Sequence, residues 1–313
     1  MTNVIEIQNL TKDYELGFVR KRSVRALDDL SLTVHSGQIF GFLGGNGAGK
    51  TTTIKLLMRL LFPSSGSARI LGRDIADVEM HRQIGYCPEN PYFYDYLTAR
   101  ELMNYFGELF GYDRARQKAR TEELLASVGL EEKSWNKQLR TFSKGMLQRV
   151  GLAQALINHP EVVFLDEPMS GLDPIGRREV RQLISGLRDR GMTVFMSTHI
   201  LSDIESLCDE VAILRGGKLA ATGSLDQLLK ADDQQRGFEI SLAGVSEDGL
   251  RANLQENAGL EIHSAPKGVI VVTPDESNIE IVLAAARSAG GKLISVQPVK
   301  QSLEELFVRE TAD

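Results

Sequence analysis

The sequence predicts an α/β fold in which helices cover both faces of a parallel sheet. Strand-like apolar runs occur at 38–43, 162–166 and 193–197, and helical patterns alternate with them along the chain. A Gly-rich loop joins the first run to its helix, and carboxylates or a histidine follow the other two. Because the carboxyl ends of parallel strands meet at one edge of a sheet, these loops are expected to form a single site.

The Gly-rich loop at 44–51 fits the pattern G-x-x-x-x-G-K-[ST]. In such a loop the backbone N–H groups surround a polyphosphate, and the helix N-terminus adds partial positive charge. Lys50 is expected to reach the β- and γ-phosphates, and the Thr51 hydroxyl is expected to bind Mg²⁺. The residues predicted to contact the nucleotide here are Gly44, Asn46, Gly47, Ala48, Gly49, Lys50, Thr51 and Thr52.

Two carboxylates, Asp166 and Glu167, end the second strand. A carboxylate at this end of a strand, beside a phosphate-binding loop, can hold Mg²⁺, and Asp166 has that place. Glu167 is then placed to accept a proton from an attacking water. Taken alone, an acidic pair at a strand end is often only a solvated turn, so this interpretation depends on the motifs around it.

Two further loops complete the predicted edge of the sheet. Ser170–Pro174 reads as a tight loop before a helix, and the strand at 193–197 leads to Thr198 and His199. A single histidine is usually structural, and each motif alone has a structural explanation. Their combination in this order along the chain predicts a nucleotide-hydrolysing site.

Together these motifs resemble the nucleotide-binding subunit of ABC transporters, over residues 3 to 230. The family's signature segment, normally Leu-Ser-Gly-Gly-Gln, is here Phe142-Ser143-Lys144-Gly145-Met146, which keeps a hydroxyl and a bare backbone N–H at a helix start. The resemblance implies that Ser143, Lys144 and Gly145 contact ATP bound by a second subunit. The enzyme it implies is a head-to-tail homodimer with ATP at the interface.

The resemblance also implies a role for each remaining motif. Glu167 polarises the attacking water, His199 contacts the γ-phosphate, and Asp173 couples the two ATP sites. Tyr14 matches the aromatic residue that stacks on adenine, although tyrosine is also common in ordinary strands. Glu89 stands where the family usually has glutamine, and a carboxylate there could act in catalysis by accepting a water or approaching the metal. The implied Mg²⁺ ligands are Thr51, Asp166 and Glu89.

The composition favours an ATPase whose membrane-spanning part is a separate protein. The net charge of −6 argues against nucleic acid as a main partner. The two cysteines lie far apart in the sequence, which fits a reducing compartment. No apolar run approaches ~18 residues and no signal peptide opens the chain, so we expect a cytoplasmic protein, peripheral on the inner face of the cell membrane. Transmembrane permease subunits are the implied partners and provide the only membrane contact.

The signature variant Ser-Lys-Gly-Met resembles that of drug, lipid and polysaccharide exporters, which favours export over import. One alternative is a soluble ABC ATPase with a mechanical or regulatory role, although such proteins usually carry two nucleotide domains or a long coiled coil. Another alternative is a nucleotide-binding module without hydrolysis, which the presence of Glu167 disfavours.

The chain is predicted to form two domains. Residues 1–231 form the ABC ATPase domain, and its helical insert at about 97–160 begins with a capping box of Thr98 and Glu101. Residues 232–313 form a small ferredoxin-like α+β domain, whose role in dimer stabilisation, regulation or sensing stays open. Its expected strands are Phe238–Leu242, Leu260–Ser264, Gly268–Thr273 and Lys292–Pro298, and its expected helices are 246–257, 277–289 and 302–307.

Two segments of the first domain have unusual composition. Residues 91–96 include four aromatic side chains, which are expected either to pack beneath the helical insert or, as the resemblance implies, to receive a short helix of the membrane subunit. Residues 18–25 carry a run of basic side chains at an expected hairpin tip. This run predicts a solvated face, with acidic lipid headgroups as the lesser alternative.

Overall fold

A computed structural model of the chain describes residues 2–17, 22–230, 237–254, 259–266 and 268–298. The chain divides into two compact units, the first reaching Leu225 and the second beginning at Asp226. Each unit has its own hydrophobic core. Residues 18–21 of the basic run and the expected helix at 302–307 lie outside the described residues.

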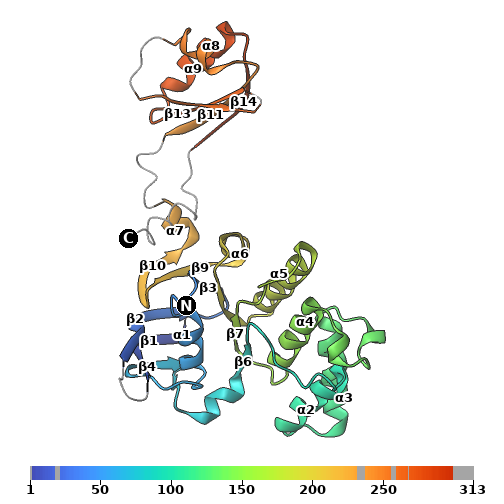
Figure 1. Ribbon diagram of the computed structural model, residues 1–313. Helices are drawn as coiled ribbons and strands as arrows, with labels where there is room; N and C mark the ends of the chain where they lie inside the picture. The colour runs from blue at the N-terminus through green and yellow to red at the C-terminus, as the bar shows by residue number, and fades with distance from the viewer. Residues whose placement is uncertain (1, 18–21, 231–236, 255–258, 267, 299–313) are drawn as a thin grey trace. The chain divides into compact units, whose positions relative to one another are not determined.

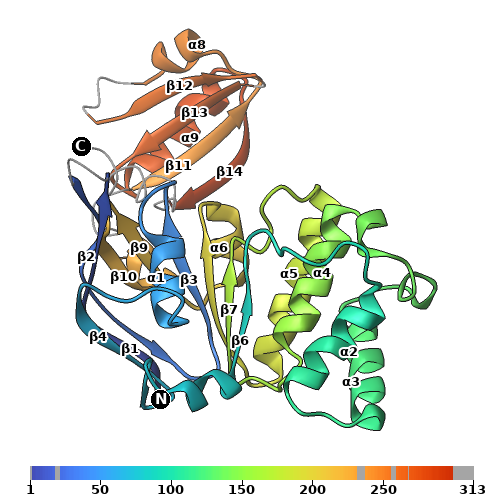
Figure 2. The same cartoon turned by 60° about the horizontal axis from the view of Figure 1, so that its bottom comes forward.

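The first unit contains the predicted parallel sheet (Figures 1 and 2). Its strands are β3 Ile39–Gly44, β6 Ile84–Cys87, β7 Val162–Asp166, β8 Thr193–Thr198, β9 Glu210–Arg215 and β10 Lys218–Ser224. The order is β10-β9-β3-β8-β7-β6, and all neighbours are parallel except β10, which is antiparallel to β9. β3, β7 and β8 are buried along their whole length, as expected for strands covered on both faces.

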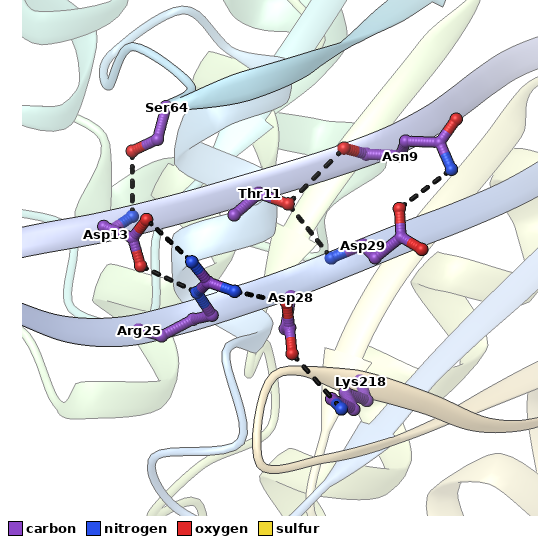
Figure 3. Close-up of polar contacts among 8 residues, drawn as sticks. All are labelled: Asn9, Thr11, Asp13, Arg25, Asp28, Asp29, Ser64 and Lys218. Carbon is purple, nitrogen blue, oxygen red and sulfur yellow. Dashed lines mark hydrogen bonds and ion pairs between the residues drawn. The ribbon is translucent and has the colours of Figure 1, made fainter.

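A second sheet in this unit is antiparallel, with the order β2-β1-β4-β5. It consists of β1 Asn3–Leu16, β2 Arg22–His35, β4 Ser65–Ile70 and β5 Arg73–Asp74. The β1–β2 register shifts near Asn9 and Asp29, whose φ angles of 49° and 56° are left-handed. Asn9 Nδ2 donates to Asp29 Oδ1 at 2.8 Å, and the Asp29 N–H donates to Thr11 Oγ1 at 3.1 Å (Figure 3). These local hydrogen bonds stabilise the bulged pairing.

Helices cover both faces of the parallel sheet, which confirms the predicted α/β fold. α1, Lys50–Leu57, lies between the two sheets, where it contacts β2, β3, β4 and β7. On the opposite face, α5, Pro174–Asp189, and α6, Leu201–Leu207, pack on β8, and α6 also contacts β3. Four buried phenylalanine rings join the central strands: the Phe195 centroid lies 5.2 to 5.6 Å from those of Phe40, Phe42 and Phe164.

Three helices gather beside the edge strand β6, as Figures 1 and 2 show. They are α2 Ala99–Leu109, α3 Arg114–Ser127 and α4 Lys144–Ala155, and α4 contacts β6 directly. The predicted capping box at the start of α2 is confirmed, since the Glu101 N–H donates to Thr98 Oγ1 at 3.1 Å and the Thr98 N–H donates to Glu101 Oε2 at 2.8 Å. Short 3₁₀ turns are found at Val78–Gln83, Glu132–Ser134 and Leu139–Thr141.

The second unit begins within α7, Leu225–Lys230, and after this helix it has the predicted β-α-β-β-α-β sequence of elements. Its elements are β11 Phe238–Ala243, α8 Glu247–Arg251, β12 Glu261–Ala265, β13 Gly268–Thr273, α9 Asn278–Ser288 and β14 Lys292–Pro298. The strands are antiparallel in the order β12-β13-β11-β14, which is the ferredoxin-like arrangement.

The helix predicted at 246–257 is wrong in length, because α8 ends at Arg251. Gly249 has low helix propensity, and Asn253 Nδ2 donates to the Gly249 carbonyl at 2.9 Å. A side chain that bonds a nearby carbonyl in this way offers the backbone an alternative to further helix.

Among the described residues of both units, no helix combines the length and the apolar character needed to cross a bilayer.

Candidate active site

The Gly-rich loop and segments at the ends of β6, β7 and β8 line a hollow of about 480 Å³. The loop contributes residues 45–52, and Glu89, Glu167 and His199 reach the hollow from three other segments. Ala26 and Ser170 also line it. Residues far apart in the chain therefore meet at the edge of the sheet where the sequence analysis expects a site.

Two glycines give the loop a backbone conformation that other residues rarely adopt. Gly47 has a φ of 80° and Gly49 a φ of 107°, both in the left-handed region. A Cβ atom on Gly49 would also lie 2.7 Å from the carbonyl oxygen of Ala26, so no side chain fits there. α1 begins at the next residue, which places the unpaired N–H groups of its first turn beside the hollow.

Lys50, Glu167 and His199 form a chain of side-chain contacts at the hollow. Lys50 Nζ lies 3.2 Å from Glu167 Oε1, and Glu167 Oε2 lies 2.8 Å from His199 Nδ1. Lys50 Nζ also donates to the carbonyl oxygens of Gly44 and Gly45, at 2.7 and 3.2 Å. Gly44 thus contacts Lys50 but does not itself line the hollow. Lys50 and Glu167 are both buried, so each charge depends on the other for compensation.

Asp166 lies behind Thr51 and not in the wall of the hollow. Thr51 Oγ1 and Ser197 Oγ both donate to Asp166 Oδ1, at 3.2 and 2.6 Å. Burial raises the pKa of Asp166, these two hydrogen bonds lower it, and the nearby charges of Glu167 and Glu89 raise it again. A cation at this position would favour the charged carboxylate over the neutral acid.

The Thr51 hydroxyl and the Asp166 carboxylate fit a Mg²⁺ ion that is shared with phosphate oxygens. Both are hard oxygen ligands, and Mg²⁺ in proteins is usually held by one or two carboxylates together with substrate phosphates. In the part of the chain that the structure describes, no group of three His, Cys, Asp or Glu side chains could hold a metal ion by itself. The arrangement therefore suits a metal that arrives with a nucleotide.

The backbone of Glu167 directs its side chain into the hollow. Its φ of 48° is left-handed, which is uncommon for a residue with a side chain. The Glu167 N–H donates to Ser197 Oγ at 3.0 Å and to the Ser197 carbonyl at 3.2 Å, which ties this residue to β8. Strained backbone held in this way is concentrated at functional sites.

Glu89 has a hydrogen-bond partner in the loop that follows β7. Ser170 Oγ donates to Glu89 Oε1 at 3.2 Å, so the carboxylate lies beside the loop that follows Glu167. A glutamine at position 89 could accept the same hydrogen bond through its carbonyl oxygen.

The signature residues line a second hollow, of about 400 Å³, separate from the first. Ser143, Lys144 and Gly145 meet Asp173 there, and none of these residues lines the hollow of the Gly-rich loop. Ser143 caps α4 by accepting from the Met146 N–H at 3.3 Å, and Asp173 caps α5 by accepting from the Gly176 N–H at 2.8 Å. The predicted site residues therefore divide between two hollows of one chain.

Tyr14 does not line either hollow. It pairs across the hairpin with Val24, and Lys12 Nζ lies 5.3 Å from the centroid of its ring. Ala26, two residues further along β2, lines the first hollow although the sequence offered no sign of it. Ser170 also lines the first hollow. It opens the loop at 170–174, and its position three residues after Glu167 is the sequence feature that could have indicated a place in the site.

Comparisons with known proteins agree with this geometry. The family model described as ABC transporter matches residues 27–170. An uncharacterized ABC transporter ATP-binding protein of Synechocystis is 43% identical over 98% of this chain and 84% of its own length. The bacitracin transport ATP-binding protein BcrA of Bacillus licheniformis is 42% identical over 77% of this chain and 76% of its own length.

A solved dimeric ATP-binding cassette, MJ0796, in a post-hydrolysis state with ADP and Pi, is 26% identical to this chain. Its TM-score is 0.64, over 71% of this chain and 98% of the cassette. The fold and the site define a P-loop ATPase of the ABC type. The chain belongs to the ABC transporter family, as an ATP-binding subunit.

Proposed function

We propose that the protein hydrolyses MgATP between two copies of itself, arranged head to tail, and thereby drives export through separate transmembrane subunits. The observation that carries this proposal is the division of the site residues between two hollows of one chain. A phosphate-binding loop in the first hollow and a helix N-terminus in the second are complementary halves of one anion site. A symmetric pair of chains can join each half to the other.

The residues around the first hollow have distinct roles in this mechanism. The loop N–H groups and Lys50 bind the β- and γ-phosphates, while Thr51 and Asp166 would hold Mg²⁺, which neutralises phosphate charge. Glu167 accepts the proton of the attacking water, and its contact with His199 orients both side chains. His199 and the partner's signature helix stabilise the charge on the transferred phosphoryl group.

The roles assigned to Asp173 and Tyr14 complete the proposal. Asp173 caps the helix that lines the second hollow, so it can transmit a change at one ATP site to the other. Tyr14 stacks on an adenine that extends beyond the first hollow, along the hairpin that contributes Ala26 to its wall. Export is supported by the signature variant and by the similarity to a bacitracin transport protein. We place the protein at the inner face of the cell membrane, attached through its transmembrane partner.

Replacing Glu89 with alanine should lower ATP turnover about tenfold with little change in nucleotide affinity, because Glu89 helps to place water and metal but does not hold phosphate. Glu89→Gln should retain turnover, since an amide oxygen can still accept from Ser170. Steady-state ATPase rates and ATP binding of both variants test this. Unchanged basal and transporter-stimulated rates for Glu89→Ala would remove Glu89 from the reaction.

The aromatic segment at 91–96 supports a docking site for the transmembrane partner. Tyr92 is 99% exposed and Tyr94 and Tyr96 are also exposed, so the alternative that these tyrosines pack as core is wrong. An adjoining hollow of about 340 Å³ is predominantly apolar. It is lined by Met58, Ile84, Gly85, Tyr86, Pro88, Pro91, Tyr92, Phe93, Phe106, Phe110, Gln154, Ala155 and Asn158. A short amphipathic helix is the partner that fits such a groove.

Replacing Tyr92 and Tyr94 with serine should release the protein from membranes that contain its transmembrane partner. Because both side chains are exposed, the melting temperature and ATP binding should stay unchanged. Phe62→Ser provides a matched control, since Phe62 is an exposed aromatic residue that does not line the groove. Co-sedimentation with membranes measures attachment. Retained attachment of the double variant would place the partner surface elsewhere.

A further inference from the structure

Arg25, the last basic residue of the run at 18–25, is held in an ion-pair network on the β1–β2 hairpin (Figure 3). Its Nε and Nη2 atoms donate to the two carboxylate oxygens of Asp13, at 2.8 and 3.3 Å. Its Nη1 atom donates to Asp28 Oδ1 at 2.9 Å. Arg25 is exposed, as expected of a solvated face, and in addition each of its three side-chain nitrogen atoms has a carboxylate partner.

The same network joins the hairpin to two neighbouring segments. Asp28 Oδ2 lies 3.2 Å from Lys218 Nζ at the start of β10, and the Asp28 N–H donates to the Gly217 carbonyl at 2.8 Å. Ser64 Oγ, just before β4, accepts from the Asp13 N–H at 2.9 Å. Arg25 thus lies at the centre of contacts that fix β1 and β2 against the turn between β9 and β10 (Figure 3).

The strand pairing places Arg25 and Asp13 on one face of the hairpin and Tyr14 on the other. Asp13 pairs with Arg25 and Tyr14 pairs with Val24, so these two pairs face opposite sides of the sheet. Ala26 is the extra residue at a register shift between the Arg25–Asp13 and Leu27–Lys12 pairs, and it lines the first hollow. The Asp13–Arg25 ion pair therefore occupies the face of the hairpin opposite to Tyr14.

Close contacts fix Ala26 against the phosphate-binding loop. Its carbonyl oxygen is 2.7 Å from the position that a Cβ on Gly49 would take, and 2.9 Å from the corresponding position on Gly217. The Gly217 N–H donates to the Ala48 carbonyl at 3.0 Å. The phosphate-binding loop, the hairpin and the β9–β10 turn are in close contact at Ala26. A shift of the hairpin would therefore move Ala26 and change the shape of the first hollow.

We propose that Arg25 is a positioning residue for the base end of the bound nucleotide. It holds β1 and β2 from behind, so that the Tyr14 face of the hairpin keeps a fixed distance from the phosphate-binding loop. The inference rests on the proposed function, because it assumes that ATP is bound with its phosphates at Lys50 and its base toward Tyr14. It extends that function by naming the residue that sets the spacing between the two ends of the ligand.

The test compares two ligands of the full-length chain, ATP and inorganic tripolyphosphate, in the presence of Mg²⁺. Arg25→Met should weaken ATP binding about threefold to tenfold and raise the KM for ATP equally, with kcat unchanged. Tripolyphosphate binding should not change, because this ligand has no base to position. Arg25→Lys keeps the charge but loses the bidentate contact with Asp13, so it should restore ATP binding only in part.

Arg73→Met is the matched control. Arg73 lies in β5 of the same sheet, is 50% exposed against 53% for Arg25, and pairs with Asp77 at 3.0 Å. This variant should leave both ligands unaffected. If Arg25→Met does not fold, Asp13→Ala removes both carboxylate oxygens that Arg25 contacts and should give the same pattern. If Arg25→Met weakened the binding of ATP and tripolyphosphate equally, or left ATP affinity unchanged, the role of Arg25 would be overturned and the proposed function would still stand. A wild-type chain that binds neither ligand would instead overturn the proposed function.

Discussion

Glu167→Gln is expected to reduce ATP turnover by about 10²–10⁴ while ATP still binds, since the amide cannot accept the proton of the attacking water. Glutamine keeps the shape of the side chain and can still contact Lys50 through its carbonyl oxygen. Because ATP then persists at the interface, the variant should accumulate as an ATP-bound dimer. Size-exclusion chromatography with and without ATP detects that species.

Glu161→Gln is the control for the loss of one carboxylate charge next to the same strand. Glu161 directly precedes β7, at the end opposite to Glu167, and accepts a hydrogen bond from Gln83 Nε2 at 2.9 Å. Its amide variant should hydrolyse ATP at the wild-type rate. Turnover close to wild type for Glu167→Gln would remove this residue from the role of general base.

Gly145→Asp is expected to lower hydrolysis by about 10²–10³ without unfolding the subunit. A Cβ at Gly145 meets only Leu172 Cδ2, at 3.9 Å, so the substitution causes no clash within the chain. The added carboxylate would lie at the start of the signature helix, where it repels the γ-phosphate of the partner's ATP. Binding of ATP to the first hollow should persist, because Gly145 does not line it.

The comparison variant for Gly145→Asp is Gly186→Asp. Gly186 is a helical glycine of α5 with no atom within 4 Å of an added Cβ, so it accepts the same side chain away from both hollows. Hydrolysis rates and ATP affinities of the two variants separate a local effect from a general cost of added charge. If Gly145→Asp also abolished ATP binding by the separate subunit, the division between two hollows would be incorrect.

The sequence predicts the central fold well because strands buried on both faces are read as continuous apolar runs. β7 and β8 end within one residue of the positions where their motifs begin. In the second unit, β11 and β13 follow the alternating pattern closely. The short α8 could not be predicted in the same way, because the hydrogen bond from Asn253 to Gly249 depends on local geometry that a hydrophobic pattern does not contain.

Site residues with reactive or charged side chains can be recognised in sequence motifs. Residues that only shape the site cannot be recognised in this way. Glu167 and Lys50 stand in motifs, whereas Ala26 lines the hollow without any functional group of its own. The partners of Arg25 depend on the β1–β2 register, which shifts at the bulges and so cannot be counted from the sequence. The exposure of Tyr92 also required the structure, because aromatic clusters occur both in cores and at interfaces.

The central claim is that each ATP site is built from two copies of the chain, and mixing two inactive variants tests it most directly. Lys50→Met disables the first hollow and Gly145→Asp disables the second, so neither variant alone forms an intact composite site. In an equal mixture, half of the pairs would be mixed, and each would contain one intact site, giving about a quarter of the wild-type number. The account predicts that mixing restores ATP hydrolysis well above the sum of the separate rates. Hydrolysis equal to that sum would contradict it.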